Sequence, residues 1–559
     1  MDDLEGLLKG QKIAYFSMEV GLVNEIPTYA GGLGILAGDT IRSSADLRIP
    51  LVAVTLVSKK GFFRQELTPK GEQIEHSQDW DPSKYMRLLP HEVSVHIQGR
   101  EVKVKAWLYT LKSVTGGVVP VLFLDTDVEG NTAEDREITF YLYGGDQKYR
   151  VKQEVVLGIG GVRLLDALGF KIRKYHINEG HASFLALELL HKYAMDVEKV
   201  RELCVFTTHT PVESGHDKFS YELVREILDG TTDMSALKRF GGADHLNMTL
   251  LALNLSNYVN GVAERHREVS SRMFAGYEIH AITNGIHSYM WTGESYRKLY
   301  DKYLPGWANE PELLARVADG IPNEEIWQAH KEQKVRLIDY VNEWTKAGLS
   351  YDVFTLGFAR RATEYKRARL LFSDIGRLKK INKKGKFQLI FAGKAHPRDL
   401  QGKKLIEDLF GYANQLKPDI KMVYLENYDI AMATKLVSGV DVWLNTPLKP
   451  LEASGTSGMK AAHNGVLNFS VLDGWWLEGW IEGVTGWSIG PPPEEGLDSQ
   501  ETYQKELEDL YNKLEYVIIP MFYNRRDDWV RMMKKSIGKV AYYFNSHRMM
   551  RRYVTEAYL

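Results

Sequence analysis

Short runs of apolar and β-branched residues recur along the chain and alternate with longer stretches that have a helical pattern. The strand-like runs lie at 12–20, 49–57, 118–124 and 203–210, and again at 352–359, 387–395, 421–426 and 441–447. Runs of this length are typical of buried strands, whereas 323–347 has the length of a long helix. This regular alternation predicts an α/β protein whose strands form doubly wound parallel sheets.

The strand-like runs fall into two series, which predicts two Rossmann-like domains. The first series ends near "HAITNGIH" at 280–287, and a mostly helical stretch at 291–348 separates it from the second. We therefore expect domains at 1–287 and 288–559 that face each other across a cleft. Clefts between domains are preferred ligand sites, so we expect the functional groups there.

Composition and charge exclude several other classes of protein. The chain has 559 residues, of which 44% are hydrophobic and 26% charged, as is typical of soluble globular proteins. Its net charge of −2 offers no basis for binding to nucleic acid or to a membrane surface. The single cysteine, Cys204, cannot form an internal disulfide. The N-terminus has no secretory pattern and no run reaches the roughly 18 apolar residues of a membrane-spanning helix, so we expect a cytoplasmic enzyme.

Several strand-like runs end in Gly, Asn, Thr or His, in the segments "HINEGH", "FTTHTP", "ITNGIH" and "IFAGK". Open α/β sheets bind ligands beyond the carboxyl ends of their strands. Each segment on its own is equally typical of a capped turn. Their recurrence at strand ends favours a functional site.

A glycine-rich segment, "YAGGLGILAGD" at 29–39, precedes a helix-compatible stretch. Gly31, Gly32 and Gly34 would let the backbone approach an anion, and a helix N-terminus offers free N–H groups. The segment matches neither the dinucleotide fingerprint nor the P-loop, so an ordinary tight turn is the open alternative.

A basic run follows the strand-like segment at 352–359, within "FARRATEYKRARLL" at 358–371. Its cations are Arg360, Arg361, Lys366, Arg367 and Arg369. Such a run is usually a solvated helix face. Its place directly after a strand favours a phosphate clamp, because Arg and Lys both bind phosphate well.

The segment "EASGTSGMKAAHNG" at 452–465 places Lys460 between an amide-rich loop and a helix-like start. The amides from Ser454 to Gly458 are suited to a phosphate, and a buried lysine binds either an anion or an aldehyde. Pyridoxal 5′-phosphate carries both groups.

These segments, in this order, resemble the α-glucan phosphorylases, the family of glycogen, starch and maltodextrin phosphorylases. The lysine segment is similar to the family's pyridoxal-phosphate motif and "RRATEYKR" to its phosphate-binding motif. "YAGGLG", "HINEGH", "ITNGI" and "ENY" at 426–428 match further blocks, so that the resemblance spans about residues 12 to 480. It implies a type B glycosyltransferase fold in which the amphipathic, helical segment 525–559 packs back on the first domain.

The resemblance also implies an activity, reversible phosphorolysis with retention of configuration. Phosphate would release the non-reducing terminal α-1,4-glucosyl unit of glycogen, starch or maltodextrin as α-glucose 1-phosphate. Pyridoxal 5′-phosphate would be the cofactor, with its 5′-phosphate as a proton relay, and no metal is expected. The partners would be an α-1,4-glucan and inorganic phosphate, and the protein could form a homodimer. The first domain would hold glucan and phosphate, and the second the cofactor.

Site residues follow from the positions that match the family's motifs. Lys460 would bind the cofactor's aldehyde, and Arg361 and Lys366 would bind inorganic phosphate. The residues implied in catalysis are Lys460, Arg361, Lys366, His181, Thr456 and Arg360. The residues implied in cofactor binding are Lys460, Thr456, Ser457, Tyr428 and Arg360. The residues implied in substrate binding are Gly31, Gly32, His181, Asn284, Tyr365, Glu452, Ser454 and Gly455.

The chain departs from the family pattern at two positions of the basic run. Arg360 stands where the family often has Lys, which keeps the charge but changes its geometry. Thr363 stands where the family often has His, so the polar network there must differ. Many members are longer and carry N-terminal regulatory segments, so no regulation is carried over.

Three other functions stay open from the sequence. A nucleotide-sugar-dependent glycogen or starch synthase would share the two-domain architecture without needing the lysine. A catalytically inactive glucan-binding protein would not need the phosphate clamp. An aminotransferase-type pyridoxal enzyme would need an acidic partner for the pyridine nitrogen, which we do not find in the sequence.

Overall fold

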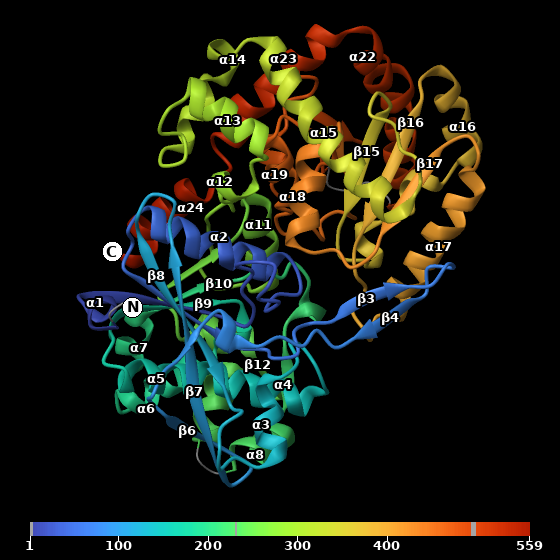
Figure 1. The fold of residues 1–559 in the computed structure, drawn as a ribbon. Coiled ribbons are helices and arrows are strands. Elements are labelled where there is room, and N and C mark those ends of the chain that lie inside the picture. Colours follow the sequence, from blue (N-terminus) through green and yellow to red (C-terminus); the bar gives the residue numbers. More distant parts are fainter. Residues whose placement is uncertain (1–3, 230–231, 494–498) are drawn as a thin grey trace. The chain divides into compact units, whose positions relative to one another are not determined.

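A computed structural model describes residues 4–229, 232–493 and 499–559, which fold into two compact α/β units (Figure 1). The first unit contains the chain up to Phe63, Ser77–Thr283 and Met549–Leu559, and the second contains Arg64–His76 and Asn284–Arg548. Each unit is built on a largely parallel sheet, which confirms the predicted fold class. In the described residues, no helix is both long enough and apolar enough to cross a membrane.

The first unit is built on a sheet with the strand order β14-β13-β10-β9-β1-β2-β8-β7-β5, in which β6 also pairs with β7. Its parallel strands are β1 (Gln11–Ser17), β2 (Leu51–Leu56), β8 (Val118–Asp125), β9 (Lys171–Asn178), β10 (Cys204–Thr207), β13 (Tyr258–Gly261) and β14 (His280–Ala281). Its antiparallel additions are β5 (Arg87–Leu88), β6 (Val93–Ile97) and β7 (Arg100–Lys112). The four strand-like runs predicted for this half all contain strands.

Helices and a short strand pair complete the first unit. The helices are α1 (Leu4–Leu8), α2 (Gly32–Asp46), α3 (Ala133–Arg136), α4 (Gln147–Val155), α5 (Gly161–Ala167), α6 (Phe184–Lys192), α7 (Val197–Leu203), α8 (Tyr221–Leu228), α9 (Met234–Gly241), α10 (Met248–Asn254) and α11 (Glu264–Met273). The strand pair is β11 (Lys218–Ser220) with β12 (His245–Asn247). Helix α2 packs closely on the loop after β1, because a Cβ on Gly38 would lie 1.9 Å from the carbonyl oxygen of Gly21.

The last residues of the chain join the first unit through buried tyrosines. The hydroxyl of Tyr558 lies 2.6 Å from Nδ1 of His176 on β9. The hydroxyl of Tyr553 lies 3.1 Å from Oγ1 of Thr207 on β10 and accepts from Nδ2 of Asn260 on β13. The C-terminus therefore attaches to three neighbouring parallel strands.

The second unit has a wholly parallel sheet with the order β17-β16-β15-β18-β19-β20. Its strands are β15 (Phe354–Ala359), β16 (Phe387–Ala392), β17 (Lys421–Leu425), β18 (Val442–Asn445), β19 (Leu467–Val471) and β20 (Gly486–Ile489). A hairpin of β3 (Arg64–Leu67) and β4 (Gln73–His76) lies beside α17 (Figure 1), where Glu75 pairs with Lys403.

The helices of the second unit include the long helix predicted between the two strand series. They are α12 (Ser288–Trp291), α13 (Glu294–Tyr303), α14 (Val317–Gly320), α15 (Asn323–Thr345), α16 (Ile375–Lys384), α17 (Leu400–Leu416), α18 (Ile430–Gly439), α19 (Ser457–His463), α20 (Trp476–Gly479), α21 (Ser499–Lys513), α22 (Ile519–Asn524) and α23 (Arg526–Ser536). Helix α24 (Ser546–Arg552) follows at the C-terminal end, so the predicted helical character of 525–559 is confirmed.

A buried carboxylate holds the central strands of this second sheet. Asp441, just before β18, accepts from Nζ of Lys334 (2.6 Å), from the backbone N–H of Thr355 on β15 (2.7 Å) and from the ring of His330 (2.8 Å). The side chains of Asp441 and Lys334 are 0% and 5% exposed, so the pair is shielded from solvent. Asp441 thereby fixes α15, β15 and β18, and the segments after these two strands carry most of the predicted site residues.

We predict that Asp441→Asn lowers the free energy of unfolding by about 3–5 kcal/mol, because it leaves the Lys334 ammonium buried without its counter-charge. Urea unfolding followed by tryptophan fluorescence measures the change. Asp166→Asn is the control, since its partner Lys192 forms an exposed pair that contributes about 1 kcal/mol or less. Equal losses in the two variants would contradict the role given to Asp441.

Candidate active site

Lys460 is the fourth residue of the short helix α19 and is 7% exposed. Its Nζ lies 3.9 Å from the centre of the Trp291 ring, so the ammonium faces an aromatic surface. Trp291 itself is buried. This is not the setting of an ordinary surface lysine, as the sequence predicted.

Asn464 links the lysine helix to the segment that carries Trp291. Its side-chain amide donates to the carbonyl oxygens of Lys460 and Trp291, both at 2.9 Å, and its Oδ1 accepts from the N–H of Gly293. His463 adds a second link through Ser288, at 2.9 Å. The position of the Lys460 side chain against Trp291 is therefore determined by neighbouring backbone.

The loop before α19 needs its glycines. Gly455 has a φ of 78°, a left-handed conformation that favours glycine. A Cβ on Gly458 would lie 2.3 Å from Oδ1 of Asn468 and 2.6 Å from the Trp475 ring. The helix begins at Ser457, and its first amides have no partner within the helix. The loop thus brings free amides close to Lys460.

Glu452, eight positions before the lysine, connects this loop to the basic run. Its carboxylate accepts from Nζ of Lys366 at 2.7 and 2.8 Å and from Nη2 of Arg360 at 2.5 Å. All three side chains are 10% exposed or less. Burial alone would raise the pKa of Glu452, but the Arg360 and Lys366 charges outweigh it and lower the pKa to about 2.

Several buried polar atoms around this cluster have no hydrogen-bond partner within the described residues. They are Nη1 of Arg360, Oγ1 of Thr363, Oδ1 of Asn445 and Oγ of Ser454. Buried polar groups are rarely left unpaired in folded proteins. These atoms follow β15 and β18, so a polar ligand at the ends of these strands could pair with them.

The other predicted residues of the second unit differ in exposure and in the contacts that they make. Arg361 is exposed, whereas Tyr428 is partly buried and its pKa is raised by burial. Tyr365 is also partly buried, and its carbonyl oxygen accepts from the N–H of Leu448. Ser457 accepts at Oγ from Nε1 of Trp443, at 3.0 Å. The carbonyl oxygen of Asn284 accepts from Nη2 of Arg548, and its side-chain Oδ1 is buried without a partner among the described residues.

Three predicted residues belong to the first unit. Gly31 and Gly32 open α2, and a Cβ on either would meet no atom within 4 Å, so the backbone there is accessible. His181 follows β9 in a short 3-10 turn. The N–H of Gly31 donates to Oε2 of Glu19, whose Oε1 accepts from the hydroxyl of Tyr143. The Tyr143 ring lies 5.6 Å from that of His181, so one chain of contacts connects the glycine segment to the histidine.

The sequence reasoning missed two residues at the same strand ends, Glu179 and His209. Glu179 has a φ of 69°, which is uncommon for a residue with a side chain. Its carboxylate accepts from the N–H of Gly180, the N–H of His209 and the hydroxyl of Thr210. His209 also lies 2.7 Å from Oδ1 of Asn178. Glu179 lies in "HINEGH" and His209 in "FTTHTP", but His181 was the one residue of these segments predicted to belong to the site.

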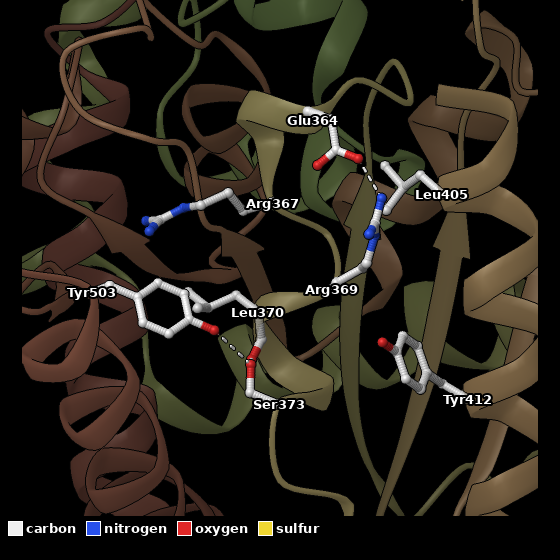
Figure 2. A pocket seen from close by; sticks show the side chains of 8 residues that line it. All are labelled: Glu364, Arg367, Arg369, Leu370, Ser373, Leu405, Tyr412 and Tyr503. Atoms are coloured by element: carbon white, nitrogen blue, oxygen red, sulfur yellow. Dashed lines mark hydrogen bonds and ion pairs between the residues drawn. The ribbon is translucent and has the colours of Figure 1, made fainter. Parts of the chain in front are cut away.

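A separate pocket of about 280 Å³ opens beside the end of the basic run (Figure 2). Arg367 and Arg369 line it, together with Glu364, Leu370, Ser373, Leu405, Tyr412 and Tyr503. Figure 2 shows Arg369 paired with Glu364, and Ser373 with Tyr503. Glu452 and Lys460 do not line this pocket, so the basic run divides into two parts, which face different surroundings.

Comparisons with known proteins agree with this arrangement. The pattern of the carbohydrate phosphorylase family matches residues 205–481, which include the Glu452 cluster and the lysine helix. Maltodextrin phosphorylase of Thermococcus litoralis is 39% identical, over 98% of this chain and 70% of that protein. The chain belongs to the carbohydrate phosphorylase family. Glycogen phosphorylase of Aquifex aeolicus is 37% identical over 98% of this chain and 86% of that protein. An uncharacterized protein of Methanocaldococcus jannaschii is 32% identical over 98% of this chain and 99% of that protein.

Membership of the carbohydrate phosphorylase family confirms the resemblance read from the motifs. The two departures from the family pattern lie beside the Glu452 cluster. The guanidinium of Arg360 reaches Glu452 with one amino group while the other has no partner in the described residues, which an ammonium at this position could not reproduce. The buried hydroxyl of Thr363 likewise has no partner in the part of the chain that the structure describes.

We predict that Glu452 makes the stability of the ligand-free protein depend on pH in the acid range. Its pKa is lower in the folded protein, about 2, than the usual 4.5 of the unfolded chain. The stabilisation is therefore complete above about pH 5 and is lost as the pH falls toward 2, a total of about 3 kcal/mol. Urea unfolding of the wild type and of Glu452→Gln between pH 7 and pH 3 measures it. A difference between the two proteins that stays constant over this range would contradict the prediction.

Proposed function

We propose that the protein is an α-glucan phosphorylase that transfers the non-reducing terminal glucosyl unit of an α-1,4-glucan to inorganic phosphate. Its relatives are named maltodextrin and glycogen phosphorylase. The observation that carries the proposal is the buried cluster of Arg360, Lys366 and Glu452, in which Glu452 lies eight positions before the buried Lys460 in the chain. One carboxylate shared by two cations leaves the cluster with one net positive charge, which favours the binding of a phosphate.

We propose pyridoxal 5′-phosphate as the cofactor of this site. Lys460 would hold its aldehyde, the amides of Thr456 and Ser457 its phosphate, and Tyr428 and Arg360 would lie beside it. The fit rests on the buried amine, on the first amides of α19, which have no partner within the helix, and on Nη1 of Arg360, which has no partner among the described residues. When bound, the group would supply a phosphate that exchanges a proton near neutral pH.

Other residues of the chain would bind and orient the two substrates. Arg361 and Lys366 would orient inorganic phosphate so that one of its oxygens bonds to C1 of the terminal glucosyl unit as the glycosidic C1–O bond breaks. The leaving oxygen would take up the proton that hydrogen phosphate gives up, and configuration at C1 would be retained. The glucosyl unit would be held by Gly31, Gly32, His181, Asn284, Tyr365, Glu452, Ser454 and Gly455.

The nucleotide-sugar synthase is the alternative. It does not require the buried Lys460, and the relatives named above give it no support. Glucose 1-phosphate release from maltoheptaose and inorganic phosphate tests the proposal directly. Glucosyl transfer from a nucleotide sugar without phosphorolysis would favour the alternative.

We predict that Lys460→Ala abolishes phosphorolysis with little change in fold, because it removes the cofactor's anchor and leaves the core intact. Glucose 1-phosphate release and far-ultraviolet circular dichroism measure the two effects. In the wild type, borohydride reduction followed by peptide mapping should place pyridoxal phosphate on Lys460. Full activity of a cofactor-free Lys460→Ala preparation would contradict the phosphorylase proposal.

We predict that Arg361→Ala and Lys366→Ala each lower kcat/KM for phosphate by roughly ten- to hundredfold or more. A charge-assisted hydrogen bond to a phosphate contributes about 1.5–3 kcal/mol. The effect should appear in both reaction directions, since both use the same phosphate. Lys366→Ala should have the larger effect because it also releases Glu452.

Arg369→Ala is the matched control for the clamp. It belongs to the same basic run but pairs with Glu364 and lines the separate pocket. Its kinetic effect should be small, and bound pyridoxal phosphate should stay in all three variants. Equal defects at Arg361, Lys366 and Arg369 would identify the run as a structural charge patch.

A further inference from the structure

A cluster of charged side chains surrounds His181 in the first unit. Nη2 of Arg150 donates to Oδ2 of Asp217 at 2.9 Å, and Nε of Arg150 donates to Oε1 of Glu154 at 3.2 Å. Oδ2 of Asp217 also lies 3.5 Å from Nε2 of His181. The Tyr143 ring contacts both Arg150, at 4.5 Å, and His181. Asp217 is thus the link between a buried guanidinium and the imidazole.

The charges of this cluster balance only if one carboxyl group is protonated. Burial raises the pKa of Glu154 well above its usual value, and the nearby Asp217 charge raises it further. Burial would also raise the pKa of Asp217, but the Arg150 charge outweighs it and keeps that pKa low. A neutral Glu154 and an ionised Asp217 therefore share the single cation of Arg150.

His181 is neutral in these surroundings, since burial and the Arg150 charge lower its pKa to about 4. A neutral imidazole carries one N–H, and its position depends on which nitrogen faces an acceptor. Nε2 faces the Asp217 carboxylate, so Nε2 carries the hydrogen. Nδ1 is then an acceptor, and it is buried without a partner among the described residues.

We propose that Asp217 is a positioning residue that holds His181 in the Nε2–H tautomer, so that Nδ1 accepts a hydrogen bond from a hydroxyl group of the bound glucan. Arg150 keeps Asp217 in place and ionised. The role of His181 at the glucan rests on the function proposed above, whereas its tautomer does not. The distance of 3.5 Å from Asp217 to Nε2 would shorten to a hydrogen bond when the hydroxyl binds, since such contacts are often long without ligand.

Asp217→Asn is the decisive variant, because it keeps the shape of the side chain and replaces the carboxylate by an amide. Oδ2 of Asp217 faces both Arg150 and His181, so an amide oxygen in its place is a neutral and weaker acceptor for Nε2–H, which shifts His181 toward the Nδ1–H tautomer. The same kind of substitution disables catalytic histidines in hydrolases through the wrong tautomer. Nitrogen NMR of ¹⁵N-histidine-labelled protein reports the tautomer, with His181→Gln identifying the His181 signals.

The kinetic test uses maltoheptaose and inorganic phosphate. Asp217→Asn should lower kcat/KM for the glucan by roughly ten- to hundredfold, the effect of one hydrogen bond to a polar substrate group. KM for phosphate should change less than threefold. In a His181→Ala background, Asp217→Asn should cause no further loss, because the residues act as one unit. Glu154→Gln should cost less than threefold, since glutamine resembles the neutral carboxyl group.

Asp135→Asn is the matched control. Asp135 is a buried aspartate of the same unit, held by Nε and Nη2 of Arg100 at 2.9 and 2.8 Å. Its variant should leave the His181 signals and the kinetics as in the wild type.

Two results would overturn the inference. One is a His181 tautomer that Asp217→Asn does not change. The other is that Asp217→Asn lowers kcat/KM for the glucan as much in the His181→Ala background as in the wild type. Absence of glucose 1-phosphate release by the wild type would instead refute the proposed function, and the NMR result would still decide the tautomer.

Discussion

The carboxylate of Glu452, shared between Arg360 and Lys366, is the interaction on which the candidate site of the second unit depends. The two cations follow β15 and the carboxylate follows β18, two strands that are neighbours in the sheet. Two buried cations would repel each other, and one carboxylate between them removes this cost. Arg367 closes the same junction by donating to the carbonyl oxygens of Thr446 and Pro447. A parallel sheet thus brings segments about 90 residues apart into one polar cluster.

The first unit also has buried charged groups that need partners, and different residues supply them. Its polar groups also gather at the ends of parallel strands, where Glu19 and Glu179 each accept several donors. Two residues there, Glu179 and Tyr143, have positive φ values of 69° and 54°. Such backbone conformations cost free energy and persist only where surrounding contacts hold them, as they do at many ligand sites. The hydrogen bonds of Glu179 and Tyr143 supply these contacts.

The sequence predicted β1, β2, β8, β10 and β15 to β18, because buried strands read as continuous apolar runs. It missed the parallel strands β13, β19 and β20, and it missed β7, whose exposed and buried residues alternate. It identified Lys460 and the basic run, since their chemistry lies within a few consecutive residues. It could not pair Glu452 with Arg360 and Lys366, or Asp217 with His181, because these contacts join segments that are distant in the chain. It also treated the basic run as a unit, whereas the fold buries Lys366, exposes Arg361 and directs Arg369 to another pocket.

The second unit has two buried carboxylates, Asp441 and Glu452, whose hydrogen-bond networks differ. The network around Asp441 is structural, whereas the network around Glu452 is suited to binding a ligand. Both oxygens of Asp441 are paired, and its cation Lys334 also donates to the carbonyl oxygen of Val353. Glu452 is equally well paired, yet Arg360 and Ser454 beside it keep buried atoms without partners in the described residues. An unpaired buried polar atom costs free energy that a bound ligand can recover. A phosphate that pairs with these donors would therefore stabilise the second unit as well as bind to it, since a ligand that binds only the folded state adds its binding free energy to stability.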